Sequence, residues 1–156
     1  MDQSFTRGLP ARSAGGQCLK SLLFTDTPPT GKRAIWLLPV SGGGAPQPVV
    51  MTSYNAIGGR LSPDGRWLAF DSDETGQREV YIQHFPGPGT RVRVSSSGGL
   101  MPAWSRSGTE LLYWERARLM AVELRLGAEI ALGAHTALFQ ANLQSGGSTG
   151  AVRPTP

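Results

Sequence analysis

Residues 146–150 of this 156-residue chain contain the pattern most suggestive of chemistry. Their sequence, GGSTG, matches the G-x-S-x-G turn that carries a nucleophilic serine in many hydrolases. That turn needs a buried strand before the serine, a helix after it and a histidine downstream, and only six residues follow Gly150. We interpret the match as a coincidence within a Gly/Ser-rich segment. No catalytic residue is predicted.

The histidines and an isolated aspartate are the other candidates for chemistry. His84 and His135 are the only histidines, and neither has another metal ligand at a typical ligand spacing. Asp64 lies in the segment SPDG at 62–65, where a lone carboxylate most often caps the local backbone. The sequence contains no GxxxxGK[ST] loop and no kinase ATP-binding loop. We therefore predict no bound metal and no cofactor.

The elements that position these residues are predicted to be strands, because the chain contains a repeat. The segment LSPDGRWLAF at 61–70 returns in altered form as WSRSGTELLY at 104–113, a spacing of 43 residues. A period of 40–45 residues with strand-like sequence on both sides is typical of β-propeller blades, each a four-stranded sheet. The predicted fold is all-β, a partial β-propeller of about three antiparallel blades with the first blade incomplete.

The repeated segment contains a hairpin corner between the first two strands of a blade. Proline presets φ at the second position, aspartate bonds the local backbone and glycine accepts a positive φ. These preferences predict a type I turn closed by a glycine bulge. The residues assigned to this structural motif are Ser62, Pro63, Asp64 and Gly65 in one unit and Ser105 and Gly108 in the next.

Short apolar runs between Gly, Pro, Ser and Asp clusters divide the chain. Residues 1–18 are predicted to be irregular, and residues 141–156 to form a disordered tail. Blades are predicted at about 19–56, 57–99 and 100–140. Their strands are expected at 21–26, 34–40, 49–52, 57–62, 66–72, 78–85, 90–96, 100–105, 109–115, 118–124 and 136–140. The first unit has GQCL where the corner should fall, so it lacks a recognisable innermost strand.

The second strand of each complete unit contains an apolar run, WLAF in one and LLYW in the other. Absence of alternation predicts strands buried on both faces, as between neighbouring blades. The large aromatic side chains are accordingly predicted to be wedges between blades: Trp36, Trp67, Tyr81, Phe85, Trp104 and Trp114. For Trp114, beside Glu115, an exposed aromatic binding surface is the alternative.

The composition excludes several classes of function. The net charge is +4, but the arginines are spread along the chain, which favours solvated blade edges over a nucleic-acid footprint. No apolar run approaches the length of a membrane span, and the first residues do not resemble a signal peptide. Cys18 is the single cysteine, which excludes an internal disulfide.

The succession of motifs resembles a known family of repeats. SDETGQREVYIQHFPGPG at 72–89, PAWSRSGTELLY at 102–113 and LMAVEL at 119–124 are similar to the TolB-like, WD-type propeller repeats of bacteria. The resemblance extends to the C-terminal propeller of some bacterial Ser/Thr kinases. It implies a six- or seven-bladed ring that serves as an interaction or sensing platform, commonly in the periplasm or elsewhere outside the cytoplasm.

Three hypotheses for the function follow. The first is a non-catalytic propeller segment that binds a protein partner or a ligand as part of a larger ring. The second is a severed regulatory propeller of a bacterial Ser/Thr kinase or of a propeller-bearing peptidase. The third is a three-blade protein that self-associates, two copies closing a six-bladed ring, because propellers normally need at least four blades and open blade ends would expose apolar faces.

Overall fold

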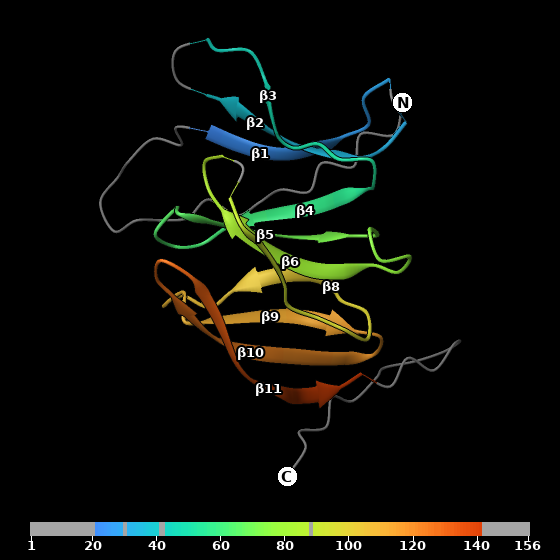
Figure 1. The fold of residues 1–156 in the computed structure, drawn as a ribbon, viewed down its shortest axis with the longest axis vertical. Helices are drawn as coiled ribbons and strands as arrows, with labels where there is room; N and C mark the ends of the chain where they lie inside the picture. The colour runs from blue at the N-terminus through green and yellow to red at the C-terminus, as the bar shows by residue number, and fades with distance from the viewer. Residues whose placement is uncertain (1–20, 30, 41–42, 88, 142–156) are drawn as a thin grey trace, which may run out of the picture.

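The computed structural model describes residues 21–29, 31–40, 43–87 and 89–141, and these form eleven strands in three antiparallel sheets. The sheets lie one above another, with the second between the first and the third (Figure 1). Within each sheet the strands follow one another in chain order. This arrangement of consecutive blade-like sheets is a partial β-propeller. None of the described residues forms a helix long and apolar enough to cross a membrane.

The first sheet consists of β1 (Ser21–Asp26), β2 (Ala34–Pro39) and β3 (Gln47–Val50). Among the described residues it has three strands where the other two sheets have four, and the position at which the sequence lacks an innermost strand and corner, before residue 20, lies outside the described residues. Strand β3 was expected at 49–52 and lies two residues earlier. Pro48 is tolerated there because it pairs with Trp36 at a register shift on the last strand of the sheet.

The second sheet consists of β4 (Ala56–Leu61), β5 (Trp67–Ser72), β6 (Glu79–His84) and β7 (Arg91–Arg93). Strand β7 is shorter than the predicted 90–96. Beyond Arg93 a side chain replaces part of the backbone ladder, because the Val80 N–H donates to the Ser95 hydroxyl at 2.8 Å. The prediction of an extended strand over 94–96 was therefore wrong.

The third sheet consists of β8 (Leu100–Trp104), β9 (Glu110–Glu115), β10 (Arg118–Leu126) and β11 (Ile130–Gln140). Strand β11 begins well before the predicted residue 136. The reason is that β10 continues to Leu126, which pairs with Ile130 across a short turn. The hairpin is longer than the apolar runs in the sequence indicated.

Two apolar clusters hold the sheets together. One lies between the first and second sheets and includes Ile35, Leu68, Phe70 and Tyr81. The other lies between the second and third sheets and includes Trp67, Ala69, Ile82, Leu111, Tyr113 and Val122. All six residues of β5 are buried, which is the predicted burial on both faces.

The same prediction was wrong for β9. Its residues alternate, with Leu111 and Tyr113 buried and Leu112 and Trp114 only half-buried. The physical reason is that, among the described residues, the third sheet has a neighbouring sheet on one side only (Figure 1).

The aromatic wedges divide into two groups for the same reason. Trp67 and Tyr81 are buried between sheets, and Phe85 packs against the edge of the first cluster. Trp104 is half-buried, and its indole N–H donates to the carbonyl oxygen of Arg60 at 2.9 Å, which links the third sheet to the second. The half-buried Trp36 and Trp114 lie in the two outer sheets and, among the described residues, do not pack between two sheets.

Two predicted segments fall outside the described residues. The irregular segment at 1–18, with Cys18, is one of them. The tail at 141–156, with the GGSTG pattern, is the other, except for Ala141, whose N–H donates to the carbonyl oxygen of Ala117 at 2.7 Å.

Candidate functional site

The predicted corner motif forms a tight turn at one end of β4 and β5. The Gly65 N–H donates to the Ser62 carbonyl at 2.9 Å, and Gly65 has φ +72°. The Ser62 hydroxyl donates to the Asp64 carboxylate at 2.5 Å and accepts from the Trp67 N–H at 3.0 Å. Arg66 also pairs with Asp64. Asp64 accepts the Arg66 N–H at 3.1 Å, so this carboxylate caps the local backbone, and the bonds from the Ser62 hydroxyl and Arg66 lower its pKa to about 2.

The second corner has the same backbone form without proline or aspartate. The Gly108 N–H donates to the Ser105 carbonyl at 3.0 Å, and Gly108 has φ +74°. The two corners meet, because a Cβ placed on Gly108 would lie 3.3 Å from Cδ of Pro63. Together with β10 they enclose a shallow depression of about 210 Å³, the corner groove. Its lining residues are Ser62, Pro63, Asp64, Arg66, Ser107, Gly108, Thr109, Leu124 and Leu126.

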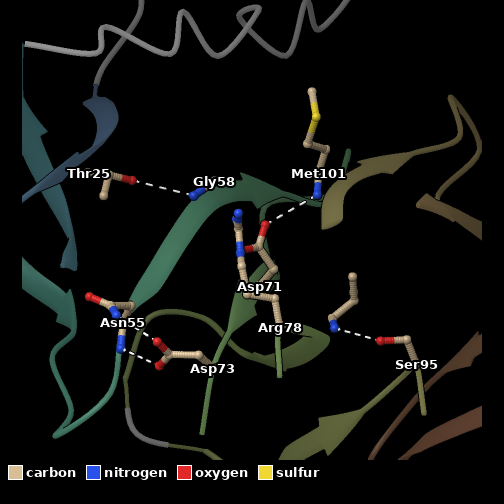
Figure 2. Close-up of polar contacts among 9 residues, drawn as sticks. Thr25, Asn55, Gly58, Asp71, Asp73, Arg78, Ser95 and Met101 are labelled. Carbon is tan, nitrogen blue, oxygen red and sulfur yellow. Dashed lines mark hydrogen bonds and ion pairs between the residues drawn. The ribbon is translucent and has the colours of Figure 1, made fainter. Parts of the chain in front are cut away.

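The end of β4 and β5 opposite to the corner carries a different polar arrangement. We call this end the loop rim and define it by residues 51–55, 73–78 and 96–101. Asp71, near the end of β5, has a side chain that is only 1% exposed. Its carboxylate pairs with the guanidinium of Arg78, with an Nε–Oδ1 distance of 2.8 Å, and accepts the Met101 N–H at 3.2 Å (Figure 2). Burial raises the pKa of Asp71, and the bonds from Arg78 and Met101 oppose that increase.

Asp71 therefore connects the second sheet to the start of the third. Met101 is the second residue of β8 and has φ +54°, which is unusual for a residue with a side chain. A strained backbone persists only where its surroundings hold it, and the bond from Met101 to Asp71 is one such constraint. The Met101 side chain itself is 69% exposed.

A second carboxylate holds the loop that leads into β4. Asp73 accepts the Asn55 N–H at 2.8 Å and the Asn55 side-chain amide at 2.6 Å (Figure 2). These bonds lower the pKa of Asp73. Asn55 also accepts the Arg33 N–H at 3.0 Å, and Thr25 accepts the Gly58 N–H at 3.4 Å. The first sheet is thereby tied to the same end of the second sheet.

Large apolar side chains gather at the loop rim. Among the described residues five large hydrophobic side chains are exposed, and three of them lie there: Met51, Tyr54 and Met101. Met51 and Tyr54 lie in the connection from β3 to β4, and Met101 is the second residue of β8. Asp73 bonds Asn55, next to Tyr54, and Asp71 bonds the backbone of Met101, so hydrogen bonds hold the rim backbone at these two places.

The histidines do not contribute to either end. The ring of His84 packs edge-on against Trp67, with centroids 5.1 Å apart. His135 places Nδ1 3.1 Å from the hydroxyl of Tyr113, and burial raises the pKa of that tyrosine to about 12. Within the described part of the chain no three His, Cys, Asp or Glu side chains converge to form a candidate metal site.

The sequence indicated the corners, but the loop rim was missed. The available signal was Asp71, a charged residue next to the apolar run WLAF of a strand predicted to be buried. A buried carboxylate needs a partner, so its position should have predicted a polar junction with the next blade. Nothing in the local sequence identified Arg78 or Met101 as the partners.

These features define a partial β-propeller with two tight corners at one end and an ordered, partly apolar rim at the other. No protein-family model matches the sequence. The curated proteins contain no match. Solved structures with a similar fold include a putative TolB from Agrobacterium tumefaciens, with a TM-score of 0.48 and 20% identity over 78% of this chain. They also include the tricorn protease, with a TM-score of 0.47 and 14% identity over 60% of this chain. This chain spans 62% of the TolB chain and 9% of the protease chain.

Proposed function

We propose that this chain is a non-catalytic segment of a larger β-propeller ring, and that its loop rim binds a protein partner. The observation that carries the proposal is the group of exposed side chains Met51, Tyr54 and Met101. Aromatic residues and methionine are enriched in protein interfaces, where a few such residues supply most of the binding energy.

The constrained backbone of the rim supports a binding role. An apolar side chain on a fixed loop loses less conformational entropy on binding than one on a mobile loop. The carboxylates of the rim are engaged in holding the loops, since Asp71 bonds Arg78 and Met101 while Asp73 bonds Asn55. Neither is free to act as a general base, which favours binding over catalysis.

Two expectations from the sequence resemblance are part of this proposal. One is a location outside the cytoplasm. The other is the alternative in which the segment regulates a kinase or a peptidase encoded with it. Both concern the longer protein or the cell, and the loop rim is compatible with either.

The test is selection of peptides from a phage-displayed random library on the immobilised chain. We expect enriched peptides that contain apolar anchors and that bind at least about tenfold more weakly after Met101→Ser or Tyr54→Ser, a loss typical of an interface anchor. The matched control is Val40→Ser, which removes another exposed apolar side chain, located between β2 and β3. No enrichment, or equal loss in the control, would refute the proposal.

A further inference from the structure

A fully buried carboxylate lies beside the loop rim at the start of β6. Glu79 is the first residue of that strand, and its exposed fraction is zero. None of the ion pairs in the described part of the chain includes it. Its carboxylate instead accepts three hydrogen bonds from neutral donors, which are the Gln77 side-chain amide at 2.6 Å, the Gly98 N–H at 3.1 Å and the Ser95 hydroxyl. Burying a charge without a countercharge is costly, so its presence here calls for a reason.

The hydrogen bonds of Glu79 hold the connection from β7 to β8. Ser95 and Gly98 both belong to this connection. The next residue is held as well, because the Gly99 N–H donates to the carbonyl oxygen of Arg78 at 2.8 Å. A Cβ placed on Gly99 would overlap the Ser95 hydroxyl, so the connection is packed too closely there for a side chain.

This connection leads directly to Met101, the exposed side chain at its end. The Met101 N–H bonds Asp71 (Figure 2). Three of the four backbone amides from Gly98 to Met101 therefore donate to the hairpin formed by β5 and β6. The direction in which the Met101 side chain stands thus depends on bonds at both ends of this short segment.

The connection from the first sheet to the second is built without such a carboxylate. Ala34 begins β2 where Glu79 begins β6. In both places the carbonyl oxygen of the preceding residue accepts an N–H near the start of the next inner strand, at 2.9 and 2.8 Å respectively. A connection between these sheets can therefore form with alanine at this position. The buried charge is particular to the connection that carries Met101.

We infer that Glu79 is a positioning residue of the loop rim, whose carboxylate fixes the connection that presents Met101 to the partner. This inference rests on the proposed binding role of the rim and adds a residue that is too deeply buried to touch the partner. Hydrogen bonds to a charged acceptor are roughly twice as strong as those between neutral groups, so the carboxylate holds Gly98 more firmly than a neutral side chain would. An anchor on a fixed backbone loses less entropy on binding.

The test is Glu79→Gln, which keeps the size of the side chain and removes its charge. The probe is the tightest-binding peptide from the phage selection, labelled with fluorescein and titrated by fluorescence anisotropy. We expect the dissociation constant to rise at least about fivefold. The matched control is Glu110→Gln, the same change at an exposed position at the start of β9, which should leave it within about twofold. If circular dichroism shows that Glu79→Gln is unfolded, Ser95→Ala, which removes one of the three donors, replaces it in every measurement.

Double variants separate positioning from a general loss of stability. If Glu79 acts through Met101, Glu79→Gln should weaken binding less than about twofold in the Met101→Ser background. In the Tyr54→Ser background its full effect should remain, because Tyr54 lies on the other connection. An equal effect in both backgrounds, or no effect in the wild-type background, would overturn the inference and leave the proposed binding role intact.

Amide hydrogen exchange, followed by NMR, is a second measurement that needs no peptide. In Glu79→Gln the amides of Gly98, Gly99 and Met101 should exchange at least about tenfold faster. The amide of Asn55, which a different carboxylate holds, should keep its rate. Unchanged exchange in the connection would overturn the inference even where the peptide binds. A selection that enriches no peptide would refute the binding role and this inference with it.

Discussion

Replacing Arg78 by alanine should destabilise the chain through the carboxylate that it leaves behind. Asp71 is almost completely buried, and without Arg78 it would keep the Met101 N–H as its described partner. Removing one partner of a buried ion pair costs about 3–5 kcal/mol. Because the Arg78 side chain is 40% exposed, solvent screens part of the pair, and we expect a loss of about 2–3 kcal/mol.

The assay is urea unfolding at neutral pH, followed by tryptophan fluorescence and circular dichroism. The expected loss corresponds to a decrease in melting temperature of about 5–10 °C for a chain of this length. The matched control is Arg66→Ala, which removes the exposed pair with Asp64 at the corner and should cost less than about 1 kcal/mol. The double variant Asp71→Asn/Arg78→Ala should recover much of the loss, because asparagine is neutral and can still accept the Met101 N–H.

The pH dependence supplies a second check on the same reasoning. Burial raises the pKa of Asp71 above its ordinary value, and removal of Arg78 should raise it further. A carboxyl group whose pKa is higher in the folded state destabilises the fold as pH rises, because folding then favours the protonated form. The deficit of the Arg78→Ala variant should therefore shrink as pH falls from 7 toward 4. A deficit independent of pH, or a double variant as unstable as Arg78→Ala, would contradict the assigned cause.

Three further predictions concern the corner and the first junction. Gly65→Val should lower the free energy of unfolding by about 1–2 kcal/mol or more, because Gly65 has φ +72°. Gly65→Asn, which tolerates that conformation, should cost less. An unchanged melting temperature for Gly65→Val would refute the turn assignment. The wild-type free energy of unfolding should decrease as pH falls from about 4 to about 2, because the pKa of Asp64 is about 2 in the folded chain and 3.8 for an unperturbed aspartate. Asp64→Asn should lack this part of the decrease. Gly59→Ala should lower the free energy of unfolding in urea by about 1–3 kcal/mol, because its Cβ would lie 2.9 Å from Cγ2 of Ile35. No loss would indicate that the first and second sheets can move apart at this contact without cost.

The sequence by itself determined the all-β class, the repeat and the corners. These depend on local physics: Gly65 and Gly108 supply the positive φ of a tight turn, and residues 67–70 form a run too apolar for an exposed strand. Such preferences act over a few residues, so they can be recognised without knowing what packs against them.

Only the tertiary structure decided which apolar surfaces are covered and which polar groups meet. Residues 67–72 and 110–115 have similar patterns, yet one strand is buried on both faces and the other on one, because burial depends on neighbouring sheets. The partners of Asp71 lie seven and thirty residues away in the chain, on segments that the fold brings together. The local sequence cannot specify such contacts, because they depend on how one blade packs against the next.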